Sequence, residues 1–464
     1  MDDPAGNGTS KGVVLLVATT ASFIFPFTGS AVNIALPVLG KELSMDAVML
    51  GWIATAYLLS SASFLVPFGR IADIHGRKKI FTCGIVTYTL SSLLAGLASS
   101  ATMLISCRVL QGVGGAMLAG TAVALLTTVF PANERGKVLG INVAVTYIGL
   151  SLGPVLGGVL TQNLGWRSIF FVSAFLGLAV IGVVLWKLKG EWTGAKGERF
   201  DLAGSVIYIL GLVALIYGFT LLQESSGMWL GVCLIVGGII GLWAFTRWEM
   251  RIRSPVLDMS LFKNSRAFTF SNVAALINYS ATWAVSLLLS LYLQYLKGLN
   301  PQSAGLILVA MPATQAFFSP LAGRLSDRIE PRIIASAGMA LTTVGLIILI
   351  FLTEETPLAF IIGNLILLGL GFAFFSSPNT NAVMSSAPKA AYGVASATLA
   401  TMRQVGMTFS MGVAMLMFAL YIGRVQITPE YYSLFQESMK TSFIIFAILC
   451  FGGIFASLAR GKVR

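Results

Sequence analysis

The chain has 464 residues, of which 56% are hydrophobic and only 10% are charged, and its mean hydropathy is +0.86. Soluble domains carry about 25% charged residues, so this composition excludes a soluble globular protein and indicates a chain that crosses a membrane many times. The formal net charge of +12 would suit nucleic-acid binding only if it gathered on one surface. It is scattered over short loops and tails instead, so we expect no nucleic-acid partner.

Apolar stretches of about 20 residues, the length that crosses a bilayer, recur fourteen times along the chain. An even number places both termini on one side of the membrane. If that side is the cytoplasm, few Lys and Arg residues lie outside the cell, as the positive-inside rule requires: Lys41, Arg167, Lys297, Arg424 and Lys440. We therefore expect an all-α, multi-pass protein of the plasma membrane with cytoplasmic termini.

A charged hinge lies between the second and third spans, where residues 69–79 read Gly-Arg-Ile-Ala-Asp-Ile-His-Gly-Arg-Lys-Lys. Gly69 permits a close helix approach, and Asp73 can lie against the positive end of a helix, which stabilises by about 0.3 to 1 kcal/mol. The pattern recurs imperfectly after the tenth span, at Gly323 and Asp327. This repeat predicts two related halves, and the alternative is that these charges only set the topology.

Two arginines fall inside apolar spans, Arg108 in the fourth and Arg403 in the thirteenth. An arginine at the centre of a membrane helix costs about 2.5 to 3.5 kcal/mol on insertion scales unless it faces water or polar partners. A functional role in the membrane is one interpretation of Arg108. Internal hydrogen bonding to Gln111 and backbone carbonyls is the other.

The fifth span contains glycines four residues apart, which form one smooth helix face, with a proline that bends the helix among them: Gly149, Gly153, Pro154, Gly157 and Gly158. We expect this face to be a seam along which helices slide. The longest charged connections, 187–201 and 249–266, bracket two further spans. They predict a tail over 1–11, a six-helix bundle over 12–189, linkers with two extra helices over 190–265, and a second bundle with a short tail over 266–464.

These motifs resemble the major facilitator superfamily, and within it the fourteen-helix EmrB/QacA-type multidrug efflux group, also called the drug:proton antiporter-2 family. The resemblance covers nearly the whole chain and implies two pseudo-symmetric six-helix bundles plus two extra central helices. It implies a conformational gate at the two hinges, formed by Gly69, Asp73, Gly76, Arg77, Lys78, Gly323 and Asp327. It also implies a part for Arg108 in proton transfer or substrate handling, and it makes the fifth span an exporter signature.

The chain departs from this family in the first span, where Thr28 stands at the position of the family's membrane-embedded aspartate. A threonine hydroxyl does not titrate at physiological pH. All 18 Asp and Glu residues fall in tails, loops or helix ends, so carboxylate-based proton coupling lacks an obvious carrier. Candidates at the rims are Glu42, Asp46, Asp73 and Glu224.

The absence of an embedded carboxylate also favours neutral or anionic amphiphiles over cations as substrates, because a cation would meet Arg108 and Arg403 unpaired. Polar or aromatic residues in apolar spans are candidates for the substrate cavity: Thr28, Asn33, Tyr147, Asn278, Tyr279, Gln315, Asn379 and Asn381. Each of them has the alternative role of an interhelical hydrogen bond.

The sequence therefore predicts a monomeric exporter of small amphiphilic molecules by alternating access, with protons as the candidate coupling ion. The alternatives are an uncoupled facilitator, an exporter of an endogenous neutral or anionic metabolite, or a non-transporting membrane sensor of the same fold. The four cysteines show no paired spacing, and His75 has no ligand cluster around it. We expect no cofactor, no metal and no enzymatic activity, because no phosphate loop or nucleophile with a base is present.

Overall fold

Long apolar segments form helices because a bilayer leaves no water to bond backbone groups, and a helix satisfies these groups within one segment. The computed structural model describes residues 10–222, 227–252, 255–257, 259–326, 328–387 and 392–461. Fourteen of its helical spans are long and apolar enough to cross a membrane. Polar residues cap several helix starts; for example, Asp46 accepts a hydrogen bond from the Met49 amide at 2.7 Å.

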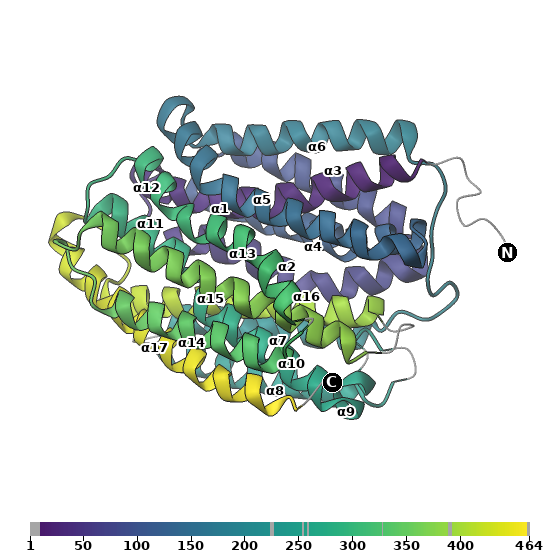
Figure 1. The fold of residues 1–464 in the computed structure, drawn as a ribbon. Coiled ribbons are helices and arrows are strands. Elements are labelled where there is room, and N and C mark those ends of the chain that lie inside the picture. The colour runs from purple at the N-terminus through teal and green to yellow at the C-terminus, as the bar shows by residue number, and fades with distance from the viewer. Residues whose placement is uncertain are drawn as a thin grey trace.

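The first half of the chain forms six helices. They are α1 (Lys11–Glu42), α2 (Ala47–His75), α3 (Arg77–Gly96), α4 (Ala101–Val129), α5 (Ala132–Leu164) and α6 (Arg167–Lys187). Within this half α1 packs along α5, while α4 packs against both α2 and α3. Figure 1 shows these purple and blue helices gathered in the upper part of the molecule.

The second half also supplies six spans, and its first two spans are each interrupted. Its helices are α9 (Ser260–Asn264), α10 (Arg266–Thr282), α11 (Ala284–Tyr295), α12 (Pro301–Leu308), α13 (Ala310–Ser326), α14 (Pro331–Ile350), α15 (Leu358–Ser385), α16 (Tyr392–Tyr421), the 3-10 turn η2 (Pro429–Tyr431) and α17 (Tyr432–Ala459). One span comprises α10 and α11, and the next comprises α12 and α13. The short α9 precedes the first of them.

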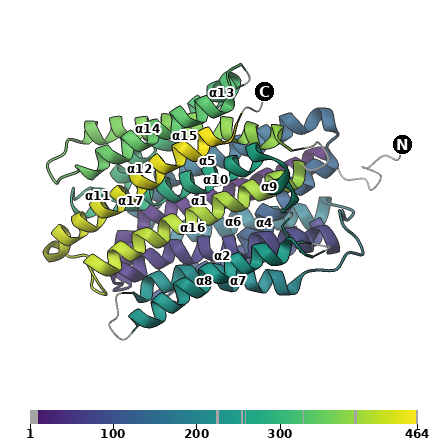
Figure 2. The same ribbon diagram turned by 90° about the horizontal axis from the view of Figure 1, so that it is seen from below.

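Two further spans, α7 (Leu202–Leu221) and α8 (Met228–Glu249), form a hairpin between the halves in the sequence. Helix α7 packs against α2 of the first half and α16 of the second, while α8 packs on α7. Figure 2 shows the hairpin alongside α2 and α16. The chain therefore consists of two six-span bundles with an accessory hairpin placed over one of the seams between them.

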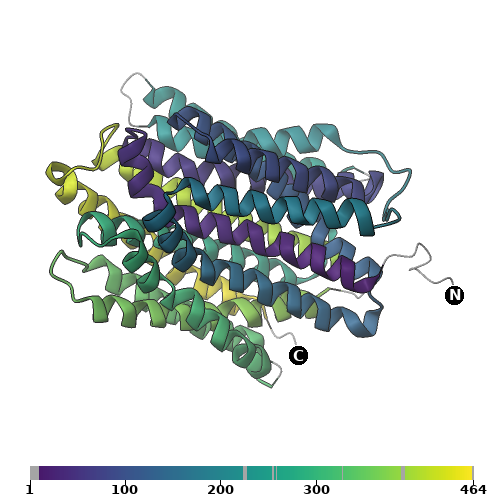
Figure 3. The ribbon, with the colours of Figure 1, turned by 90° about the horizontal axis from the view of Figure 1, so that it is seen from above.

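The two halves meet along two seams, one where α2 packs against α16 and one where α5 packs against α12 and α13. Both chain ends lie at the same end of the helical body, here called the termini end, and the opposite end is called the far end (Figure 3). Hydrogen bonds join the halves toward the far end. The Ala47 amide donates to Val425 O at 2.9 Å, and Ser290 Oγ donates to Asn33 O at 2.7 Å.

Candidate functional site

The hinge between α2 and α3 is held by an ion pair across its break. Asp73 Oδ1 lies 2.7 Å from Nη2 and 2.9 Å from Nε of Arg77. Arg77 also donates to Ala124 O at 3.1 Å and to Thr128 Oγ1 on α4. In this structure the Asp73 carboxylate is therefore paired within its own half.

The linker that follows α6 docks onto this hinge, which the sequence did not indicate. Gly76 has a φ of 123°, a conformation that favours glycine, and a Cβ built there would lie 2.5 Å from Glu191 Cδ. The Arg77 amide donates to Trp192 O at 2.8 Å, and the Lys78 amide donates to Glu191 Oε1 at 2.9 Å. Segment 187–201 thus connects the hinge directly to the accessory hairpin.

The remaining hinge positions pack against their own halves. A Cβ built on Gly69 would meet nothing within 4 Å, whereas one on Gly120 of α4 would lie 3.3 Å from the Gly69 Cα, so the close approach depends on Gly120 and not on Gly69. In the second half, a Cβ on Gly323 would lie 3.0 Å from Ser377 Oγ of α15. Asp327 lies outside the described residues.

Arg108 is fully buried and lies within a network that joins three helices of the first half. Its Nε donates to Ile53 O at 3.0 Å, its Nη1 donates to Gln111 Oε1, and its guanidinium lies 3.9 Å from the centre of the Tyr57 ring. Gln111 in turn donates to Ser92 Oγ at 2.7 Å. These contacts favour the internal, structural interpretation of Arg108, because its donors are directed at protein groups.

Thr28 also lies inside the first half, on the face of α1 that packs against α6. It is fully buried, donates to Ile24 O at 2.9 Å, and its hydroxyl lies 2.7 Å from Ser173 Oγ. It is not among the residues that line the cavity between the halves. A titratable group at this position would act on the packing of the first bundle.

The glycine face of α5 packs mainly against α1, within the first half. A Cβ on Gly149, Gly153 or Gly157 would lie 2.6 Å from Phe23 O, 1.8 Å from Ser30 Oγ and 2.7 Å from Ala31 Cα, respectively. The neighbouring face of α5 meets the second half. A Cβ on Gly158 would lie 2.5 Å from Pro301 O, and one on Gly305 would lie 2.1 Å from Pro154 O. Pro154 and Gly158 thus lie at the seam with α12.

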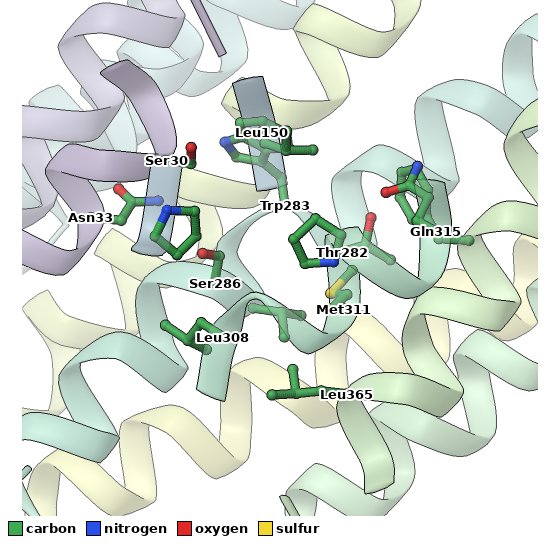
Figure 4. Close-up of a pocket in the computed structure, with 14 residues that line it drawn as sticks. Ser30, Asn33, Leu150, Thr282, Trp283, Ser286, Leu308, Met311, Gln315 and Leu365 are labelled. Atoms are coloured by element: carbon green, nitrogen blue, oxygen red, sulfur yellow. The ribbon is translucent and has the colours of Figure 1, made fainter. Parts of the chain in front are cut away.

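A cavity lies between the halves, with walls from α1 and α5 on one side and α10 to α13 and α15 on the other. The cavity has a volume of about 70 Å³, which is enough for a few waters or a small part of a substrate. Figure 4 shows Asn33 and Gln315 on opposite sides of it. Asn33 Oδ1 and Gln315 Nε2 are buried and make no hydrogen bond within the described part of the chain. Each half therefore places one unpaired amide atom in a residue of the cavity wall.

The helix interruptions in the second half lie at this cavity. Thr282 and Trp283 line it at the break between α10 and α11, and Leu308 and Met311 line it next to the break between α12 and α13. The Ala284 amide, at the start of α11, donates to Ser410 Oγ of α16 at 3.0 Å. Trp283 and Val309 keep right-handed helical φ and ψ, so each interruption is a local break in the helical hydrogen bonds and not an unwound segment.

Arg403 is only partly buried and lies beside this cavity, in aromatic surroundings. Its Nη2 donates to Thr380 Oγ1 at 2.5 Å, and its guanidinium lies 5.6 Å from the centre of the Tyr279 ring. Tyr279 packs edge-on against Phe372, a cavity wall residue, with 5.1 Å between ring centres. Tyr147 crosses from α5 to the second half, with its hydroxyl 3.0 Å from Ser376 Oγ.

The remaining predicted cavity residues are buried or partly buried and do not line the cavity. Asn278 and Asn379 are fully buried, and their side-chain nitrogen and oxygen atoms make no hydrogen bond among the described residues. Asn381 donates to Ser326 Oγ at 3.0 Å and so ties α15 to the end of α13. Asn33 and Gln315 are thus the predicted residues that the structure brings to the cavity wall.

The sequence did not indicate that one carboxyl group at a helix end is buried. Glu249, at the termini end of α8, is 2% exposed, and its Oε2 accepts a hydrogen bond from the Leu257 amide at 2.9 Å. Asp201 lies next to it and accepts from Trp248 Nε1 at 2.9 Å. The spacing of acids in a predicted loop gives no signal of such burial.

Known proteins are similar to this chain in sequence and in fold. The family model of the Major Facilitator Superfamily matches residues 18–248 and 272–462. The riboflavin transporter RibZ of Clostridioides difficile is 30% identical over 96% of this chain and 96% of its own length. The multidrug resistance protein Stp of Mycobacterium tuberculosis is 32% identical over 86% of this chain and 75% of its own length.

A solved structure gives the same fold. The bacterial homologue of the human lysosomal transporter Spinster, in its inward-facing, unoccupied form, aligns with a TM-score of 0.66 at 17% identity, over 97% of each chain. Two helical bundles around a central cavity define a membrane transporter, and the relatives are transporters and not enzymes. The chain belongs to the Major Facilitator Superfamily, in its multidrug-type group.

Proposed function

We propose that the protein is a secondary active exporter of small amphiphilic molecules that works by alternating access as a monomer in the plasma membrane. The observation that carries the proposal is the cavity between the halves, whose wall includes Asn33 from one half and Gln315 from the other. Each has one amide atom that makes no hydrogen bond among the described residues. Transporters built from two repeats bind substrate between them and expose the site to one side at a time. A substrate that bonds both amides would connect the two halves.

The distribution of basic residues supports an orientation with both termini in the cytoplasm. In that orientation the hydrogen bonds of Asn33 and Val425 with the opposite half lie toward the extracellular side. They would have to break for the cavity to open to that side. The names of the two relatives, a riboflavin transporter and a multidrug resistance protein, support small molecules as cargo.

We further propose that export is coupled to the exchange of protons. Thr28 has no titratable group, so the carrier would be a carboxyl group at a helix end, such as Glu42, Asp46 or Asp73. Transport of a compound panel by purified protein in proteoliposomes, with and without a pH gradient, tests this. We expect uptake against a gradient together with a change of lumenal pH. Uptake that ignores the pH gradient and uncouplers would contradict antiport, and absence of any uptake would contradict export.

The second candidate is an uncoupled facilitator, which the replacement of the embedded acid by Thr28 favours. It differs from the exporter in one measurable way, because it equilibrates the substrate and never concentrates it. Counterflow exchange with labelled and unlabelled compound would proceed in both cases. Only the exporter would accumulate the compound when a proton gradient is imposed.

A further inference from the structure

We propose that Arg403 binds the anionic group of the transported molecule, so that the substrate is an aromatic amphiphile bearing a carboxylate. The inference rests on the proposed transport function, because the anion is part of the cargo. The site lies between α10, α15 and α16, beside Tyr147 of α5. The Tyr279 ring, which faces Arg403, packs against Phe372, and Phe372 lines the cavity.

The hydrogen bonds of Arg403 leave donors unused. Nη2 donates to Thr380 Oγ1 at 2.5 Å, while Nε is buried and makes no hydrogen bond among the described residues. A guanidinium carries five N–H donors in a fixed fork that matches a carboxylate. Arg108 shows the contrasting case, since Ile53 O, Gln111 Oε1 and the Tyr57 ring surround its fully buried head.

The charge of Arg403 is also uncompensated. None of the ion pairs in the described part of the chain includes it, and the acidic residues of the sequence lie at helix ends, in loops or in tails. An unpaired guanidinium at membrane depth is costly, and a bound anion removes that cost. The neighbouring groups are neutral hydroxyls and rings, namely Thr380, Ser376, Tyr147 and Tyr279.

The surrounding groups define the rest of the ligand. The Tyr279 ring lies 5.6 Å from the Arg403 guanidinium, and the Phe372 ring meets Tyr279 edge-on on its way to the cavity wall. Rings in this arrangement bind a planar apolar body, while the guanidinium fork binds its charged end. The hydroxyl contact between Tyr147 and Ser376 spans both halves. A ligand held at Arg403 therefore sits where relative movement of the halves changes its surroundings.

Binding of a matched pair of fluorescent probes tests the proposal. Dansylglycine carries a carboxylate, and dansylglycinamide has the same aromatic body with a neutral amide. We expect the purified protein to bind the carboxylate about tenfold more tightly than the amide, because hydrogen bonds to ionised groups are roughly twice as strong. Arg403→Gln should bring the two affinities to within about twofold, mainly by weakening the carboxylate.

Two further variants complete the experiment. Arg403→Lys keeps the charge and loses the fork, so the carboxylate preference should fall about threefold without vanishing. If Arg403→Gln fails to fold, Arg403→Lys still tests the proposal. Arg247→Gln on α8 removes one exposed positive charge far from the site and should leave both affinities unchanged.

The proposal is overturned if both Arg403 variants retain the full carboxylate preference, if Arg403→Gln weakens both probes equally, or if the parent protein binds neither probe. These outcomes differ from failure of the proposed transport function. If only the transport function fails, the carboxylate probe would still bind through Arg403, but no compound would cross the membrane of proteoliposomes.

Discussion

Asp73 and Arg77 form a two-point ion pair across the break between α2 and α3, in which a single carboxylate oxygen meets both Nε and Nη2. Both residues belong to the first half. The Arg77 amide also donates to Trp192 O in the linker that follows α6. These contacts join the hinge to the segment that leads into the accessory hairpin. A substitution in the hinge therefore tests whether the hinge affects movement, without removing a helix.

Asp73→Asn tests the role of this pair. It removes the charge from the partner of Arg77 while keeping the side chain's size. If the pair biases the equilibrium between states, the transport rate in proteoliposomes should fall about tenfold, since a shift of that size needs only a modest change in free energy. Lys79→Ala, at an exposed position of the same hinge, is the control and should transport normally. Equal rates for Asp73→Asn and the parent would exclude a gating role.

The contact between α5 and α1 predicts a large difference between two glycines of one helix. Gly153→Ala places a Cβ 1.8 Å from Ser30 Oγ and 2.9 Å from Phe27 O, and overpacking of this kind costs about 1 to 3 kcal/mol. Gly140→Ala meets nothing within 4 Å and should leave the melting temperature unchanged or raise it. Thermal unfolding in detergent measures both. A Gly153→Ala variant as stable as Gly140→Ala would show that α1 and α5 are more loosely packed.

The buried network around Arg108 predicts that its neighbour matters for folding. Gln111→Leu would remove the acceptor of Arg108 Nη1 and the donor to Ser92 Oγ, while Ile53 O still accepts from Arg108 and Tyr88 O still accepts from Ser92. Loss of a buried partner costs about 1 to 3 kcal/mol. Leu110→Ala, a neighbouring position that is 48% exposed, should change the unfolding temperature little. The result that contradicts a structural role is a stable Gln111→Leu variant with altered transport.

Thr28→Asp restores a titratable group at the position where the family carries one. Ser173 Oγ lies 2.7 Å from the Thr28 hydroxyl and is placed to donate to the new carboxylate. We expect transport by this variant to depend more steeply on the proton gradient than transport by the parent. Thr28→Asn is the matched variant without a titratable group. Strong proton exchange by the parent itself would disprove the inference from Thr28 and assign the proton to a carboxyl group at a helix end.

Glu249 predicts a difference between two substitutions at one site. Glu249→Gln keeps an oxygen that accepts from the Leu257 amide and removes the like charge beside Asp201, so the variant should be at least as stable as the parent. Glu249→Ala leaves that amide without its acceptor and should cost about 1 to 3 kcal/mol. Thermal unfolding at neutral pH compares the two. Equal melting temperatures would mean that the loop finds another acceptor.

The number of spans, the two halves and the accessory hairpin could be predicted from the sequence, because apolar length and charge placement determine them locally. Asn33 and Gln315 could also be singled out as polar residues in apolar spans, and both line the cavity. The interruptions at Trp283 and Val309 were not predicted. At Val309 a local signal was present, because Pro312 has no amide hydrogen to donate to Leu308 O, where α12 ends. At Trp283 no proline or glycine marks the break, and the Ala284 amide bonds Ser410 Oγ of another helix.

Tertiary contacts also determine which face of a helix a residue occupies. Gly149 and Gly153 share the spacing of a seam, yet they meet α1 of their own half, and only the adjoining face of α5 reaches α12. Tertiary contacts likewise place Thr28 against α6 and Arg108 against α2, inside the first bundle. The hinge's contacts with Glu191 and Trp192 join segments that are distant in the sequence, so no local pattern signals them.

The accessory hairpin gives the molecule two unlike flanks toward the lipid. On the flank where α2 meets α16, α7 packs on both helices and α8 covers α7. On the flank where α5 meets α13, side chains such as Leu156 and Phe317 are 40% and 78% exposed. A membrane-dissolved compound that approaches sideways therefore meets a covered flank and a bare one. The seam between α5 and α13 is the one that the accessory hairpin leaves uncovered.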